Sequence, residues 1–316
     1  MQIKVKGLIH IFDKGSPSEF KALNGLSVKF DSNEFVTIIG PTGSGKTTFI
    51  EHLNALLIPT MGSVTLRTQV ESKKKRRLCK FESTKSGKRK VNKGDKVDQK
   101  ITIINSKRKI RNIKTIRSKV GVVFQFAEYQ LFEETIQKDI IFGPVSMGVP
   151  KEEAIVRAKK YIKLVGLDES YLAKSPFSLS GGQKRRVALA GILALEPETL
   201  IFDEPTAGLD PQGEIEMYSI FKKLHKEGKT IIIVTHNLDH VLEYSDRTIL
   251  FNKGEIEFDG RSIDLMYNEE LLIKNELELP KLSRLVNELE RKGLKIGKVN
   301  SIDDFAKALK KKKKKK

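Results

Sequence analysis

The chain has 316 residues, 39% hydrophobic and 31% charged, with a net charge of +19. This length suffices for one large domain and a smaller one around a substantial core, and the composition is typical of a globular protein. No stretch approaches the roughly 20 consecutive apolar residues of a membrane-spanning helix, and the N-terminus lacks the apolar core of a signal peptide, so we expect a cytoplasmic chain. The single cysteine, Cys79, excludes an internal disulfide and a cysteine-based metal cluster.

Apolar patterns at the start of the chain predict strands and a helix. Strands are expected at residues 2–8, 23–30 and 35–39, and the third is almost entirely apolar and therefore buried. A helix is expected at residues 46–57, followed by a further strand at residues 63–66.

The loop between the buried strand and the helix carries the sequence GPTGSGKTT. Its glycines let the backbone curl so that successive N–H groups face a phosphate, and the helix adds its positive N-terminal end. Lys46 is expected to reach the β- and γ-phosphates of ATP, and the Thr47 hydroxyl to ligate Mg²⁺. A glycine-rich turn with a chance Lys-Thr pair would rarely lie between a strand and a helix. The residues predicted to bind ATP here are Gly40, Pro41, Thr42, Gly43, Ser44, Gly45, Lys46, Thr47 and Thr48.

The positive charge is concentrated in two segments. Residues 67–119 contain 21 lysines and arginines against 4 acidic residues, and residues 310–316 are all lysine, so the remainder is slightly acidic. Residues 68–100 have few apolar side chains, and we predict a partly disordered insertion there. Two interpretations stay open for both segments: contact with anionic lipid headgroups, or no function at all.

Beyond the insertion, strands and helices alternate. Strands are expected at residues 101–104, 120–124, 200–202 and 230–234, and helices at residues 152–165, 181–195 and 211–227. This alternation predicts an α/β domain with a mostly parallel sheet. A hairpin of residues 247–251 and 255–258 closes it, and two further helices, at 281–292 and 303–309, predict a small C-terminal appendage.

Two acidic residues end the strand LIF at residues 200–202. Asp203 is placed to hold Mg²⁺ through water, and Glu204 to polarise the water that attacks the γ-phosphate. An Asp-Glu pair after a strand is usually only the start of a solvated loop. The pair is stronger evidence here because it follows a P-loop in the sequence and ends a strand of the same sheet.

The sequence LSGGQ at residues 179–183 opens a helix whose first amides also suit a phosphate. Together with the motifs above it resembles the ABC ATPases. The elements of that family occur here in order: the P-loop, Gln125, the signature LSGGQ, Asp203 with Glu204, the sequence AGLD at residues 207–210, and His236.

The resemblance implies an ABC-type P-loop nucleotide-binding domain, with a RecA-like core, an antiparallel β subdomain and a helical subdomain. We expect this domain at residues 1–260, interrupted by the lysine-rich insertion at 67–119. A small α/β C-terminal appendage, a candidate dimerisation element, is expected at residues 261–309, and an oligolysine tail at 310–316.

In that family two subunits stack head to tail, and each nucleotide lies between the P-loop of one subunit and the signature of the other. The resemblance therefore implies that Ser180, Gly181, Gly182 and Gln183 contact the nucleotide on the partner, with the first three at its γ-phosphate. It places Asp210 at the dimer seam.

The resemblance also implies roles for three residues outside the signature. Gln125 would complete the metal shell and sense a transmembrane partner, and His236 would contact the γ-phosphate and orient the attacking water. The family usually stacks an aromatic ring on adenine, for which Phe12 is the candidate. The alternatives are that His236 is an ordinary surface histidine and that Phe12 is an ordinary core phenylalanine.

Further stretches resemble one group in particular, the energy-coupling factor transporter ATPases, and most closely the second of their two paralogous ATPases. These stretches are GSP at residues 15–17, VVFQF at 122–126, EYQLFEET at 128–135, FGP at 142–144 and RRVALAGILA at 185–194. The lysine-rich insertion and the oligolysine tail depart from that pattern.

This resemblance implies an ATP hydrolase coupled to transport, peripheral on the cytoplasmic face of the cell membrane. It would form a heterodimer with its paralogue and dock through the Gln125 region on a transmembrane coupling subunit, driving uptake of a vitamin or metal ion captured by a membrane substrate-binding subunit. The alternative is an ABC ATPase acting on nucleic acid or ribosomes, which the basic insertion would suit. Against it, this chain has neither a coiled coil between P-loop and signature nor a second ATPase domain.

Overall fold

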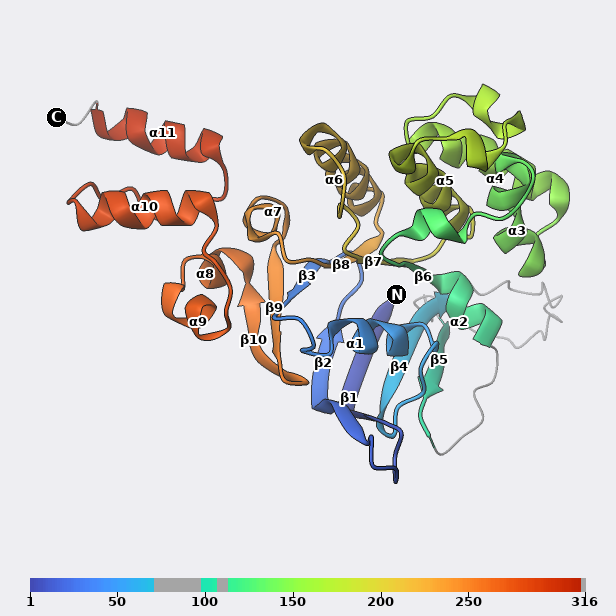
Figure 1. Ribbon diagram of the computed structural model, residues 1–316, viewed down its shortest axis with the longest axis horizontal. Helices are drawn as coiled ribbons and strands as arrows, with labels where there is room; N and C mark the ends of the chain where they lie inside the picture. The colour runs from blue at the N-terminus through green and yellow to red at the C-terminus, as the bar shows by residue number, and fades with distance from the viewer. Residues whose placement is uncertain (71–97, 107–112, 314–316) are drawn as a thin grey trace, which may run out of the picture.

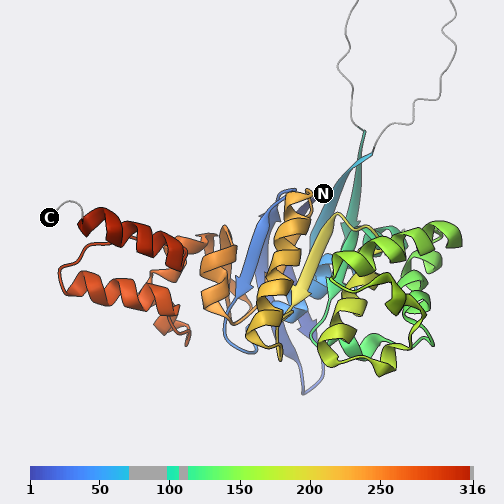
Figure 2. The same ribbon diagram turned by 90° about the horizontal axis from the view of Figure 1, so that it is seen from above.

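The computed structural model describes residues 1–70, 98–106 and 113–313, shown as a ribbon in Figure 1. Cys79 and most of the lysine-rich insertion lie outside these residues. Two sheets form the middle of the molecule, with helices α3 to α5 at one end and α10 and α11 at the other (Figures 1 and 2). Within the described residues, no helix is both long and apolar enough to cross a lipid bilayer.

The first sheet is antiparallel, with the strand order β2-β1-β4-β5. Its strands are β1 (Gln2–Phe12), β2 (Phe20–Phe30), β4 (Met61–Val70) and β5 (Asp98–Ile104). The last two are longer than predicted and extend into the segment expected to be disordered. Composition gave no sign of this, because the two strand ends pair with each other through the backbone, from Val64↔Ile104 to Val70↔Asp98.

The second sheet has the order β10-β9-β3-β8-β7-β6, parallel except for β10. Its strands are β3 (Phe35–Ile39), β6 (Val120–Val123), β7 (Thr199–Asp203), β8 (Thr230–Val234), β9 (Arg247–Asn252) and β10 (Glu255–Arg261). The carboxyl ends of β3, β8 and β7 are neighbours at one edge, where ligands of such sheets bind.

Both faces of the parallel sheet are covered, which explains the continuous apolar runs of its strands. Along β8, Ile232 and Val234 face a core shared with the antiparallel sheet and α1 (Lys46–Leu53). Ile231 and Ile233 face the opposite core, beneath α6 (Pro211–Lys226).

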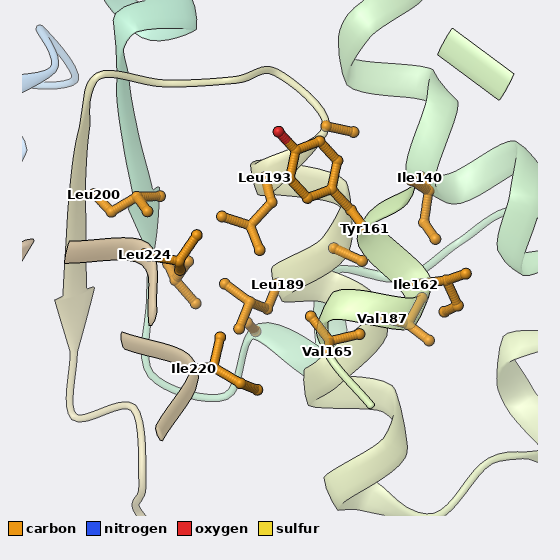
Figure 3. Close-up of a cluster of buried hydrophobic side chains, with 14 of the residues drawn as sticks. Ile140, Tyr161, Ile162, Val165, Val187, Leu189, Leu193, Leu200, Ile220 and Leu224 are labelled. Carbon is orange, nitrogen blue, oxygen red and sulfur yellow. The ribbon is translucent and has the colours of Figure 1, made fainter. Parts of the chain in front are cut away.

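The second core continues into the helical part of the molecule. Figure 3 shows Leu200 of β7 and Leu224 of α6 close to Leu189 and Leu193 of α5. The helical elements here are η1 (Ala127–Gln130), α3 (Ile136–Ser146), α4 (Lys151–Leu164), η2 (Glu169–Ala173), η3 (Pro176–Ser178) and α5 (Gly181–Leu193), with α2 (Ile113–Lys119) before β6 and α7 (Leu238–Tyr244) after β8. Since the buried side chains are contiguous, the helical part and the parallel sheet form one packed body.

The C-terminal residues differ from the expected α/β appendage. After β10 the described chain forms helices only: α8 (Ser262–Met266), α9 (Glu269–Lys274), α10 (Lys281–Arg291) and α11 (Ile302–Lys313). Leu265, Met266 and Leu272 pack on α7 and Leu250 of β9, so α8 and α9 share a core with the larger domain. The last helix runs four residues into the predicted oligolysine tail.

Candidate active site

The P-loop connects β3 to α1 in a conformation that only glycine fits. Gly40, Gly43 and Gly45 have φ of +146°, +78° and +95°. A Cβ on Gly40 would lie 2.1 Å from the Phe251 carbonyl oxygen, and one on Gly45 2.7 Å from that of Ala22. The sequence pattern therefore marks backbone positions with a steric requirement.

The side chain of Lys46 folds back over this loop. Its Nζ donates to the carbonyl oxygens of Gly40 at 2.8 Å and Pro41 at 2.9 Å. Burial lowers the pKa of Lys46, against the opposing charges of Glu204 and Asp203. A partly buried ammonium held by neutral carbonyls has a strong driving force to meet an anion.

Asp203 ends β7 beside the first turn of α1. The Thr47 hydroxyl donates to Asp203 Oδ2 at 2.9 Å, and the aspartate is only 7% exposed. Burial raises the pKa of Asp203, and the neighbouring Glu204 adds to this, while Thr47 and Lys46 counteract it. The structure thus joins two oxygen ligands of the kind that Mg²⁺ prefers.

Glu204 follows directly, at a backbone position with φ of +47°, and its amide donates to the Val234 carbonyl at 2.9 Å. This bond ties the ends of β7 and β8 together. His236, two residues beyond β8, is 76% exposed and places Nδ1 3.0 Å from Glu204 Oε2. A buried strand thus delivers each of the two predicted hydrolytic residues to the same edge.

Most of these residues surround one cavity of about 330 Å³, which His236 does not line. It is lined by Phe20, Ala22, Thr42, Gly43, Gly45, Lys46, Thr47, Thr48, Gln125, Asp203, Glu204 and Val234. The structure therefore brings together the P-loop, Gln125 after β6, and both acids after β7, as the sequence predicted.

The aromatic wall of the cavity is Phe20, which the sequence interpretation missed. Phe12 does not line the cavity; its ring packs edge-on against His10, with centroids 4.4 Å apart. The two phenylalanines are partners across the β1–β2 hairpin, and Phe20 is 57% exposed. The sequence shows an aromatic residue on each side of the turn between these two strands. Only the register of the hairpin reveals that the two rings are neighbours.

The signature residues lie elsewhere. Ser180 caps α5: its Oγ accepts from the Gln183 amide at 3.3 Å, and Gln183 Oε1 accepts from the Ser180 amide at 3.1 Å. Ser180 and Gly181 are exposed, and neither they nor Gly182 and Gln183 line the P-loop cavity. Within one chain, the two predicted phosphate-binding helix starts are not part of one site.

Asp210 is exposed in the same way. It caps α6, with Oδ1 accepting from the Gly213 amide at 2.9 Å, and does not line the cavity. Its carboxylate helps to start a helix in the isolated chain.

A family model and individual known proteins both match the chain, and they point to the same family. Residues 23–207 match the family model described as ABC transporter. The chain is 55% identical to the energy-coupling factor transporter ATP-binding protein EcfA2 of Mycoplasma mobile, over 98% of this chain and 96% of the relative. It is 50% identical to the EcfA2 protein of Mycoplasmopsis pulmonis, over 97% and 95% of the two chains.

Solved structures give the same picture. The chain resembles cbiO1 from Clostridium perfringens, described as part of the ABC transporter complex cbiONQ, with a TM-score of 0.64 and 30% identity, covering 90% of this chain and 98% of that one. It also resembles the ATP-binding cassette MJ0796, solved as a dimer in a post-hydrolysis state with ADP and Pi, with a TM-score of 0.63 and 26% identity, covering 82% and 98%.

Proposed function

The chain belongs to the ABC transporter family and is the ATP-binding and ATP-hydrolysing subunit of an energy-coupling factor transporter, and we propose which of its residues bind and hydrolyse ATP and which partner subunits complete the transporter. The carrying observation is the single cavity that joins the P-loop to Gln125, Asp203 and Glu204. The alternative of an ABC ATPase acting on nucleic acid or ribosomes gains no support from these relatives.

The P-loop residues 40–48 bind the triphosphate. Their backbone amides and the N-terminus of α1 surround the β- and γ-phosphates. Lys46 exchanges its two carbonyl partners for phosphate oxygens, which a short movement of its flexible stem allows. Phe20 or, as the family pattern suggests, Phe12 stacks on the base.

The donor set at the end of β7 fits Mg²⁺. The described residues contain no cluster of three or more His, Cys, Asp or Glu side chains suited to a metal, but a P-loop site needs fewer, because phosphate and water supply the remaining oxygens. Thr47, Asp203 and Gln125 would hold the ion, Asp203 through water. Bound there, Mg²⁺ would neutralise charge on the β- and γ-phosphates.

Glu204 is the group that polarises the attacking water. It lies next to Asp203 at the cavity wall, and its backbone is fixed by the bond to Val234. His236 contacts Glu204 and is exposed enough to turn toward a γ-phosphate. Gln125 also lines the cavity and would help to enclose that water.

A second ATPase subunit supplies the other half of the site. Ser180, Gly181, Gly182 and Gln183 are at a helix start and outside their own chain's cavity, and the first two are exposed, so this helix start is free to cap a nucleotide bound to a partner. Asp210 then lies at the seam. We propose a head-to-tail heterodimer with the paralogous ATPase of the same transporter.

The membrane partner docks beside Gln125. The side chains of Phe126, Tyr129, Phe132 and Phe142 are exposed there, in two ring pairs, on η1, α3 and the loop between them. Exposed aromatic groups on a charged surface mark protein contact sites. They fit a transmembrane coupling subunit, which would place this chain peripherally on the cytoplasmic face and drive uptake of a vitamin or metal ion through a substrate-binding subunit.

The basic insertion adds a proposed contact with anionic lipid headgroups. Deleting residues 71–97 should weaken binding to vesicles containing phosphatidylserine, measured by flotation, without changing ATP hydrolysis. Equal flotation of the deleted and full-length chains would remove the lipid contact and leave the segment without a role.

The experiment that tests the catalytic assignment is Glu204→Gln in the purified transporter. We expect ATP binding within a factor of two of wild type and a loss of about 10²- to 10⁴-fold in hydrolysis, the usual range for a positioned general base. Glu214→Gln is the matched control, since Glu214 also pairs with a histidine, His240, at 2.8 Å, but lies outside the cavity. Wild-type turnover in the Glu204 variant would refute the assignment.

A further inference from the structure

Arg185 is a buried arginine in the second turn of α5, two residues beyond the signature. It is 6% exposed, and its guanidinium forms hydrogen bonds with two other segments. Its partners connect parts of the molecule that the proposed mechanism uses separately.

The first partner is Glu128 in η1. Arg185 Nε donates to Glu128 Oε2 at 3.1 Å and Nη2 to Oε1 at 2.8 Å, a two-bond pairing of guanidinium and carboxylate. Glu128 is three residues after Gln125 and is flanked by the exposed Phe126 and Tyr129. The pair therefore joins α5 to the segment proposed to carry the docking surface.

The second partner is the segment that follows Glu204. Arg185 Nη1 donates to the Ala207 carbonyl at 2.6 Å and to that of Pro205 at 3.4 Å. These residues link Glu204 to Asp210. A single guanidinium thus bonds the docking segment on one side and the chain between the hydrolytic glutamate and the dimer seam on the other.

The chemistry of this junction requires arginine and a charged partner. The Glu128 side chain is 12% exposed. Burial acts to raise the pKa of Glu128, but the hydrogen bonds of Arg185, a hydrogen bond from the Glu128 backbone and the charge of Arg185 together outweigh it, and the pKa is lowered. A lysine ammonium has no planar fork with which to bond a carboxylate twice and two carbonyls at once.

We propose that Arg185 and Glu128 are a positioning pair that couples the docking segment to the placement of Glu204 and Asp210. Movement of η1 by a membrane partner shifts Glu128, and the guanidinium carries that shift both to the signature helix and to residues 205–207. The inference rests on the proposed function, because it assumes that Glu204 acts on water and that η1 meets the membrane partner.

The test is Arg185→Lys in the purified transporter, with ATP affinity, kcat and thermal stability measured together. Since the P-loop does not touch the pair, ATP affinity should stay within a factor of two, while kcat falls at least tenfold. Glu128→Gln keeps the shape and removes the charge, and it should lower kcat by a smaller factor, about three- to tenfold. This second variant also keeps the test decisive if the lysine variant fails to fold.

The matched control is Arg157→Lys. Arg157 also bonds a glutamate, Glu153, at 2.5 Å and a backbone carbonyl, that of Ala194, at 3.1 Å, but at the other end of α5. A merely structural role for Arg185 predicts that both lysine variants lose stability and that neither loses kcat, which would overturn the proposal. If the proposed function itself fails, Glu204→Gln retains wild-type turnover, a result that the Arg185 variants do not produce.

Discussion

Asp203 shows at the scale of one residue how the site sacrifices stability for function. The fold buries its carboxylate, and the raised pKa means that ionisation costs more in the folded chain than in the unfolded one. The Thr47 hydroxyl and the Lys46 ammonium offset only part of that cost. A divalent cation would offset the rest, so ionisation of this carboxyl becomes fully favourable only when cation and nucleotide bind.

This predicts that Asp203→Asn stabilises the nucleotide-free chain at pH 7.5, by about 0.5–2 kcal/mol, while abolishing hydrolysis. Asparagine can still accept the Thr47 hydrogen bond without the buried charge. Urea unfolding of both proteins measures the difference.

The raised pKa also predicts how the stability difference between the two proteins changes with pH. A group whose pKa is raised in the folded state is favourable when protonated and loses that advantage as pH rises through the folded pKa. The gain of the asparagine variant should therefore shrink as the pH is lowered toward the ordinary aspartate range. A variant that is less stable than wild type at pH 7.5 would contradict this account.

At the scale of elements, the β1–β2 hairpin decides which aromatic faces the nucleotide. Its register pairs Phe12 with Phe20, but only Phe20 lines the cavity. Phe12 is held by the ring of His10, which is hydrogen-bonded to the fully buried His52 of α1 at 3.1 Å. The hairpin thus presents one ring to the site and packs the other beside it.

We therefore expect Phe20→Ala to weaken ATP binding by about 5- to 150-fold, the effect of losing about 1–3 kcal/mol of base stacking. Phe12→Ala should have the smaller effect. Titration of a fluorescent ATP analogue measures both. The reverse order would restore Phe12, the residue suggested by the family pattern, as the stacking ring.

The parallel sheet and the P-loop could be predicted from the sequence because they depend on local rules. Continuous apolar runs marked β3, β7 and β8, and two glycines of the P-loop, Gly40 and Gly45, occupy positions where a Cβ would clash with neighbouring backbone. The family order of motifs then placed Gln125 and the two acids at one edge. The strands and the P-loop follow from periodicity and steric exclusion, which act over a few residues, whereas the role of Gln125 was implied only by the family resemblance.

Other elements depend on contacts that the sequence does not show. Gly143 and Pro144 argue against a helix at α3, yet burial of Ile136 and Ile140 against the helical core stabilises one. Helix α1 ends at Leu53, four residues before the predicted end, because Ala55 adopts a left-handed φ of +60°. Tertiary packing therefore outweighed the local signal at α3, and a local backbone turn ended α1 early.

At the scale of the whole molecule, the P-loop cavity and the signature are separate surfaces of one chain. The cavity lies at the edge of the parallel sheet, and the signature begins α5 in the helical part, toward one end of the molecule (Figure 2). Enclosing a γ-phosphate between a P-loop and a signature therefore needs a second subunit. Within one chain, the pair of Arg185 and Glu128 links the signature helix to the docking segment. Rigid-body motion between subunits would then carry energy to the membrane.

The central claim is that each ATP is enclosed by two chains, and the most direct measurement is the structure of the complete Glu204→Gln transporter with Mg-ATP, solved by electron cryomicroscopy. The account predicts Ser180 Oγ and the amides of Gly181 and Gly182 at hydrogen-bond distance, about 3 Å, from the γ-phosphate bound to the partner subunit. A closed, ATP-loaded assembly in which water separates Ser180 from every phosphate would contradict it.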